Sequence, residues 1–172
     1  MTGASTLIEG KVFLLGDDVN TDIHCSSKYL PGKGSDYVST IAFDELSSGL
    51  AKKISASGGI LVAGKHFGIN SSREQAVEVL RLMNVKCIIA ESFGRQFFRN
   101  AINNGLPVVE CDTSQFQNSD HLNIHMNLGI VENTSKNIKI QTQALPSEIL
   151  KIIEVGGLIP FLKLHPNWEF VE

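Results

Sequence analysis

Short apolar runs and helical patterns alternate in the middle of the chain, and this alternation constrains the fold more than any other feature. The apolar runs occupy residues 60–63, 87–90 and 107–109. A helical pattern with its apolar side chains on one face covers residues 76–83, and a second candidate helix covers residues 92–103. Strand–helix–strand units place parallel strands in one sheet. The rhythm therefore predicts an α/β fold with a parallel core.

The first part of the chain combines a strand with a longer irregular stretch. Residues 12–15 form an apolar run that ends at a glycine, which predicts a buried strand. Residues 31–35 are rich in Gly, Pro and Ser and predict a loop. Apolar residues spaced over 41–50 form one helical stripe, and residues 55–59 are typical of a turn. We therefore expect one helix over about 41–50.

The last part of the chain is more polar and strand-like. Residues 128–131 and 138–140 alternate in the manner of strands and predict an antiparallel addition to the sheet. A helix is expected to start at Pro146 and to stop at Gly156 and Gly157. Residues 1–9 and 165–172 are expected to be peripheral.

Length and charge bound the class of protein. The chain has 172 residues, and its 15 Lys and Arg against 18 Asp and Glu leave a net charge of −3. This length predicts a single domain over residues 1–172, with a core from about 10 to 162. The slightly acidic balance argues against a nucleic-acid partner. No apolar run approaches the ~20 residues that cross a bilayer, and residues 1–10 show no secretory signal. We expect neither a nucleic-acid nor a membrane partner.

The cysteines indicate a reducing compartment. Cys25, Cys87 and Cys111 are odd in number and widely scattered, which argues for the cytoplasm and against a disulfide framework. The chain contains no CxxC motif, so it is a poor host for an iron–sulfur cluster or a structural zinc ion. We therefore expect no metal on this chain.

The most informative segment is GKHFGINSSREQ, residues 64–75, which leaves a strand through a glycine-containing loop and enters a helix. Ser71 as the N-cap, with Glu74 three residues later, fits the capping-box pattern. On this structural interpretation the segment is a well-capped helix start and nothing more.

A functional interpretation gives the same residues a role in binding a ligand. A helix N-terminus favours carboxylates through its free N–H groups and dipole, and Arg73 adds a planar fork that can grip a carboxylate. With Ser71 and Ser72 beside it, this predicts a pocket for a small polyacid. The same N–H groups can stabilise a serine oxyanion that abstracts a proton next to a carboxylate. The hydrolase motif GxSxG and the phosphate-binding GxxxxGK[ST] are both absent.

At this segment the chain resembles the swivel domain of the aconitase superfamily, because residues 68–75 are similar to its GxGSSRE loop. Further blocks agree in order and spacing: residues 16–23 with Lys28-Tyr29-Leu30, residues 90–93 with 98–107, and residues 156–158. The resemblance covers roughly residues 10–162. By length and layout it is greatest to the small subunits of the 3-isopropylmalate dehydratase family and their homoaconitase relatives.

The resemblance implies a fold and a partner. It implies a swivelling β/β/α domain that docks on a separate large subunit as a heterodimer or heterotetramer. That subunit carries a [4Fe-4S] cluster, whose open iron acts as a Lewis acid on the leaving hydroxyl. The present chain would bind no cofactor and would be active only with the large subunit.

The resemblance also implies roles for particular residues. By motif position, Ser71 is the general base, while Ser72 and Arg73 bind a substrate carboxylate. Thr21 and Asp22 match a Thr-Asp pair in the active-site wall.

The implied reaction is the loss and re-addition of water on a hydroxy-dicarboxylic or tricarboxylic acid. In leucine biosynthesis this interconverts 2-isopropylmalate and 3-isopropylmalate. Two alternatives remain open. One is a related hydro-lyase acting on homoaconitate, dimethylmalate or citraconate. The other, from a different class, is a non-catalytic carboxylate-binding or assembly subunit.

The chain departs from the family pattern in three places. Asn70 stands where the family usually has Gly, and Asn tolerates a left-handed backbone better than most residues. Gln75 replaces a common His. Residues 31–34, which follow Tyr-Leu, face the variable arm of the substrate in the family. There Lys33 is either a cation for a distal carboxylate or a solvated loop lysine.

The remaining polar candidates are given structural interpretations. His121 and His125 are four residues apart, as for a metal on a helix, but their polar neighbours disfavour a helix. His66 is interpreted as loop packing. Arg99 and Asn100 together are interpreted as a buried polar brace.

Overall fold

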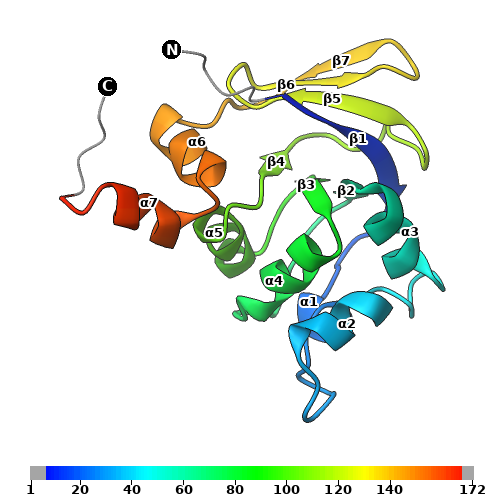
Figure 1. Ribbon diagram of the computed structural model, residues 1–172. Coiled ribbons are helices and arrows are strands. Elements are labelled where there is room, and N and C mark those ends of the chain that lie inside the picture. Colours follow the sequence, from blue (N-terminus) through cyan, green and yellow to red (C-terminus); the bar gives the residue numbers. More distant parts are fainter. Residues whose placement is uncertain (1–6, 168–172) are drawn as a thin grey trace.

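Parallel and antiparallel strands share one curled sheet in the computed structural model, which describes residues 7–167 (Figure 1). In this range seven strands pair in the order β4-β3-β2-β1-β5-β6-β7. β1 to β4 run parallel to one another, and β5, β6 and β7 are antiparallel to their neighbours. The strands are β1 Leu7–Leu14, β2 Gly59–Ala63, β3 Val85–Ala90, β4 Val108–Glu110, β5 His121–His125, β6 Ile130–Asn133 and β7 Ile138–Gln141. The expected parallel core and antiparallel addition are both confirmed.

Seven helices accompany the sheet within the same described range. They are α1 Thr21–His24, α2 Ser35–Ile41, α3 Leu50–Ser57, α4 Gln75–Leu82, α5 Arg95–Asn103, α6 Ser147–Glu154 and α7 Leu158–Leu164. In Figure 1 the helices lie along the parallel half of the sheet. β5 to β7 continue the same sheet on its other side. None of the helices of residues 7–167 is long and apolar enough to cross a membrane.

The side-chain alternation of the buried strands separates two cores. Leu61 and Ala63 of β2 pack in a cluster with the helices, whereas Ile60 and Val62 pack in a second cluster with Leu122 and other side chains of β5 and β6. Successive side chains of a strand point to opposite faces, so one strand serves both clusters. The result is three layers: helices, parallel strands and antiparallel strands. This is the expected β/β/α arrangement.

The expected helix over 41–50 is wrong. α2 ends at Ile41 and α3 begins at Leu50, with turns between them. Phe43 and Gly49 have left-handed φ values of 63° and 72°, which no helix accepts. Phe43 is fully buried, so the apolar stripe reflects core packing at a turn rather than helical periodicity. The expected turn at 55–59 is likewise displaced, because α3 continues to Ser57.

Some elements begin or occur where the sequence pattern predicted none. β1 starts at Leu7, so residues 7–9 belong to a central strand rather than to the periphery, because they pair with β5. β5 itself and α7 were not expected. His121 and His125 lie on β5, which confirms that they are not on a helix. The expected peripheral ends at 1–6 and 168–172 lie outside the described residues.

A buried aspartate ties the antiparallel strands together. Asp120 Oδ2 accepts hydrogen bonds from Gln117 N at 2.9 Å and from Asn133 Nδ2 at 2.7 Å, and Lys136 Nζ lies 3.1 Å away. Asn133 is 1% exposed, so its amide depends on this partner. Burial alone would raise the pKa of Asp120, but the bonds from Gln117, Asn133 and Lys136 outweigh it and lower this pKa.

Replacing this carboxylate should destabilise the fold in a pH-dependent way. We expect Asp120→Ala to lower the free energy of unfolding at pH 7 by about 2–3 kcal/mol, because it leaves buried donors unpaired. A carboxyl with a lowered folded-state pKa stabilises the protein above its unfolded pKa of about 3.9 and loses that effect as the pH falls. The deficit of Asp120→Ala, measured by urea denaturation, should therefore shrink below about pH 4.

Glu110→Ala is the matched control, since Glu110 is exposed on β4. It should change the free energy of unfolding by no more than about 0.5 kcal/mol. A deficit for Asp120→Ala that grows on acidification would contradict the assignment.

Candidate active site

Three loops at the carboxyl ends of β1, β2 and β3 are joined by backbone hydrogen bonds. Gly68 N donates to Val19 O at 2.8 Å, Phe67 N donates to Ser92 O at 2.9 Å, and Gly94 N donates to Phe67 O at 2.8 Å. In open α/β sheets this edge is where ligand sites form. The loop of residues 64–74, which follows β2, lies between the other two and is fixed from both sides.

The backbone of this central loop is left-handed at three positions, of which the first is His66, with φ 60°. Gly68 has φ 78°, and a Cβ added to it would lie 2.4 Å from Phe97 Cβ. Asn70 has φ 58°. Asn therefore holds the left-handed conformation expected of it, and its replacement of glycine leaves the loop geometry intact.

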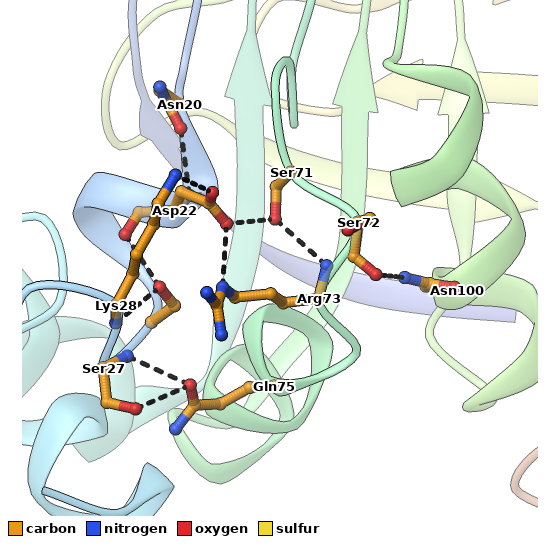
Figure 2. Close-up of polar contacts among 10 residues, drawn as sticks. Asn20, Asp22, Ser27, Lys28, Ser71, Ser72, Arg73, Gln75 and Asn100 are labelled. Atoms are coloured by element: carbon orange, nitrogen blue, oxygen red, sulfur yellow. Dashed lines mark hydrogen bonds and ion pairs between the residues drawn. The ribbon is translucent and has the colours of Figure 1, made fainter. Parts of the chain in front are cut away.

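Asp22, on α1, gathers the polar side chains of the site (Figure 2). Ser71 Oγ donates to Asp22 Oδ1 at 2.7 Å, and Lys28 Nζ donates to Asp22 Oδ2 at 2.8 Å. Arg73 Nε lies 3.6 Å from Oδ1, beyond hydrogen-bonding distance, as an ion pair. The structure thus brings Asp22 together with Ser71 and Arg73, which lie about fifty positions further along the chain.

Burial and charge act in opposite directions on Asp22, which is 5% exposed. Burial alone would raise the pKa of this carboxyl. Hydrogen bonds from Lys28 and Ser71, together with the charges of Lys28 and Arg73, outweigh burial and lower this pKa. Asp22 is therefore ionised at neutral pH and accepts the Ser71 hydroxyl proton in its hydrogen bond.

The predicted capping box at Ser71 is wrong. α4 begins at Gln75 with Glu74 as its N-cap, and residues 71–73 are not helical. Ser71 Oγ is held by Asp22 and accepts from Arg73 N at 3.3 Å. Asn100 Nδ2 donates to Ser72 O at 3.2 Å. These tertiary bonds hold the segment outside the helix, and they confirm Asn100 as a buried brace. For Arg99 the same prediction is wrong, because its side chain is exposed.

Thr21 is completely buried beside Asp22, at the first position of α1. Its Oγ1 has no hydrogen-bond partner within the described part of the chain. A buried hydroxyl without a partner costs free energy, so Thr21 Oγ1 carries an unmet hydrogen bond in this structure.

Lys33 stands apart from this group. It is exposed in the loop before α2, and its Nζ lies over the Tyr37 ring, 4.6 Å from the centroid. Gln75 connects the segment after α1 to the start of α4, because its Oε1 accepts hydrogen bonds from Ser27 N and Ser27 Oγ, each at 3.0 Å (Figure 2). Sequence reasoning did not single out Lys28 as a site residue, because no spacing rule links it to Asp22 across the turn after α1.

The donor groups of the described residues do not fit a metal or an iron–sulfur cluster. Within residues 7–167, no three His, Cys, Asp or Glu side chains are grouped so as to hold a metal ion. Cys25 and Cys87 are fully buried, and burial raises the pKa of both thiols. Burial also raises the pKa of Cys111 to about 12. All three are free thiols.

Comparison with known proteins decides the family. A model of the aconitase C-terminal domain matches residues 47–114. The chain is similar to the 3-isopropylmalate dehydratase small subunit of Halothermothrix orenii, with 39% identity over 158 residues, covering 91% of this chain and 95% of the relative. It is 45% identical over 160 residues to the corresponding subunit of Sulfolobus acidocaldarius, covering 91% and 98%.

The chain belongs to the family of 3-isopropylmalate dehydratase small subunits. The fold agrees with that of another family member, the 3-isopropylmalate dehydratase structure from Methanocaldococcus jannaschii. The TM-score is 0.84 at 32% identity, over 93% of this chain and 95% of the other. The resemblance expected from the sequence motifs is confirmed for family and fold.

Two of the left-handed positions in the loop of this family member can be tested as a pair. We expect Gly68→Ala to lower the free energy of unfolding by about 2–4 kcal/mol, since a Cβ there adds a left-handed penalty to a clash with Phe97. Asn70→Gly, which suits the same sign of φ, should change it by less than about 1 kcal/mol. Urea denaturation of both variants checks this, and equal effects would refute the loop geometry.

Proposed function

We propose that this chain is the small subunit of a cytoplasmic hydro-lyase that interconverts 2-isopropylmalate and 3-isopropylmalate in leucine biosynthesis, and that residues 1–172 act as one domain. The observation that carries the proposal is the hydrogen bond between Ser71 and the ionised Asp22, with Arg73 beside them. Membership of a family whose named relatives are 3-isopropylmalate dehydratase small subunits supports the reaction. Three free thiols fit a reducing compartment.

Ser71 is proposed as the group that moves the substrate proton. Its Oγ takes a proton from the carbon next to a substrate carboxylate. Asp22 Oδ1, 2.7 Å away and ionised, accepts the hydroxyl proton that Ser71 gives up. The charge therefore ends on a carboxylate rather than on an exposed alkoxide, which an ordinary serine does not sustain at neutral pH.

The neighbouring groups bind the diacid. The Arg73 side chain is 47% exposed and offers a guanidinium fork to a carboxylate. Ser72 is exposed next to it. Thr21 is proposed to belong to the wall of the site, with its unpartnered hydroxyl becoming a further donor only if substrate binding uncovers it.

The chain is proposed to form only part of the active site. The side chains of residues 7–167 do not fit the [4Fe-4S] cluster, so we assign the cluster to a large subunit, where it would supply a Lewis acid for the substrate hydroxyl. The functional unit is then a heteromer of small and large subunits.

Lys33 remains a proposed contact for the distal arm of the substrate. Its cation is exposed and lies over the Tyr37 ring, a contact that leaves it able to turn toward a carboxylate. A panel of 2-isopropylmalate, homoaconitate, dimethylmalate and citraconate, offered to the reconstituted enzyme, separates the substrates. Preference for the acid with a charged arm, lost in Lys33→Ala, would show that Lys33 binds it.

The role of Ser71 predicts a large loss of turnover. In a complex with an iron–sulfur large subunit encoded in the same genome, we expect Ser71→Ala to lower kcat for isopropylmalate by about 10²–10⁴-fold, the usual contribution of a general base. The isolated chain should show no turnover. Formation of the dehydrated intermediate, followed by ultraviolet absorbance, measures both.

Ser57→Ala, at the exposed end of α3, is the control and should leave kcat unchanged. If Ser71→Ala keeps more than a third of the wild-type turnover, the proposed base is wrong, and a carboxylate-binding or assembly role becomes the better account.

A further inference from the structure

One buried carboxylate faces two cations in this site. Asp22 is 5% exposed, and the charged groups that face it are Lys28 and Arg73. A single counter-ion is enough to neutralise one carboxylate. The second cation is therefore available for another role, and the geometry of the two contacts shows which cation that is.

The Lys28 contact is the tighter of the two. Lys28 Nζ is hydrogen-bonded to Asp22 Oδ2 at 2.8 Å, whereas Arg73 Nε lies 3.6 Å from Oδ1 and makes no hydrogen bond to it. Ser71 already occupies Oδ1 at 2.7 Å. Arg73 is thus loosely held and is the cation that can leave without breaking a hydrogen bond to Asp22.

Local structure fixes Lys28 in this position. Ser26 Oγ donates to Asp22 O at 2.8 Å, and Lys28 N donates to Ser26 Oγ at 3.2 Å, so the turn after α1 returns the lysine to the aspartate. The Lys28 ammonium also lies over the Tyr29 ring, 5.4 Å from its centroid. Lys28 is therefore a fixed cation and Arg73 a movable one.

We propose that Lys28 is a positioning residue: it stays on Asp22 as the permanent counter-ion, and so releases Arg73 to bind a substrate carboxylate. Without Lys28, a move of Arg73 to the substrate would leave Asp22 buried and unpaired, which is strongly unfavourable. Arg73 would then remain on Asp22 and bind substrate poorly. The role of Arg73 in binding a substrate carboxylate rests on the proposed function, whereas the exchange of cations on Asp22 does not.

The isolated chain tests the exchange without any activity. If each cation can replace the other, Lys28→Met and Arg73→Met should each lower Tm only modestly, because one counter-ion remains. The double variant should lose more than the sum of the two, by at least about 4 °C in a chain of this length. Lys28→Arg should restore most of the loss in both backgrounds.

The reconstituted enzyme tests the consequence for substrate. We expect Lys28→Met to raise KM for isopropylmalate at least tenfold while kcat changes less than threefold, since the proton-moving pair Ser71 and Asp22 is intact. Lys28→Arg should return KM to within about threefold of wild type. In an Asp22→Asn background, where no charge holds Arg73 and turnover is lost, Lys28→Met should add little to the Kd for a non-reactive dicarboxylate.

The two tests separate the claims. Additive Tm losses would overturn the proposal whatever the enzyme does, and so would a fall in kcat at unchanged KM. A wild-type pair without turnover on any acid of the panel would instead overturn the proposed function, and the Tm cycle would still decide the role of Lys28. If Lys28→Met does not fold, non-additivity measured with Lys28→Gln and Arg73→Gln replaces it.

Discussion

The Asp22 carboxylate cannot stay charged inside the fold unless donors surround it, and most of the site consists of those donors. Ser71 and Lys28 reach it by hydrogen bonds and Arg73 by a longer ion pair. These contacts hold residues 71–73 out of the helix that follows. They also leave the Arg73 guanidinium half-exposed at the surface, where it can bind a ligand.

The layers of the fold bring these groups together. β1 and β2 are adjacent and parallel, so α1 and the loop after β2 leave the sheet at the same edge. β3 supplies the third loop, whose backbone fixes Phe67 and Gly68. The antiparallel strands cover the opposite face of the parallel strands and leave this edge free. The sheet thus positions the loops, and Asp22 then fixes the side chains within them.

Periodicity predicted the part of the fold that depends on burial, and motifs predicted the family. The runs at 60–63 and 87–90 were recognisable because their strands are buried on both faces. The helix expected over 41–50 and the capping box at Ser71 failed for one reason: contacts from distant residues overrode local preference. Phe43 is buried in a left-handed turn, and Ser71 bonds Asp22. The pairing of Lys28 with Asp22 depends on a turn that no pattern reveals.

The central claim is that the edge around Asp22 holds an organic diacid against a second polypeptide. Amide hydrogen exchange of the chain, alone and in complex with the large subunit, tests it most directly. We expect protection on complex formation to be concentrated in residues 16–24 and 64–74, and to increase further when a non-reactive dicarboxylate is added. Protection confined to β5, β6 and β7, with these two loops unchanged, would contradict it.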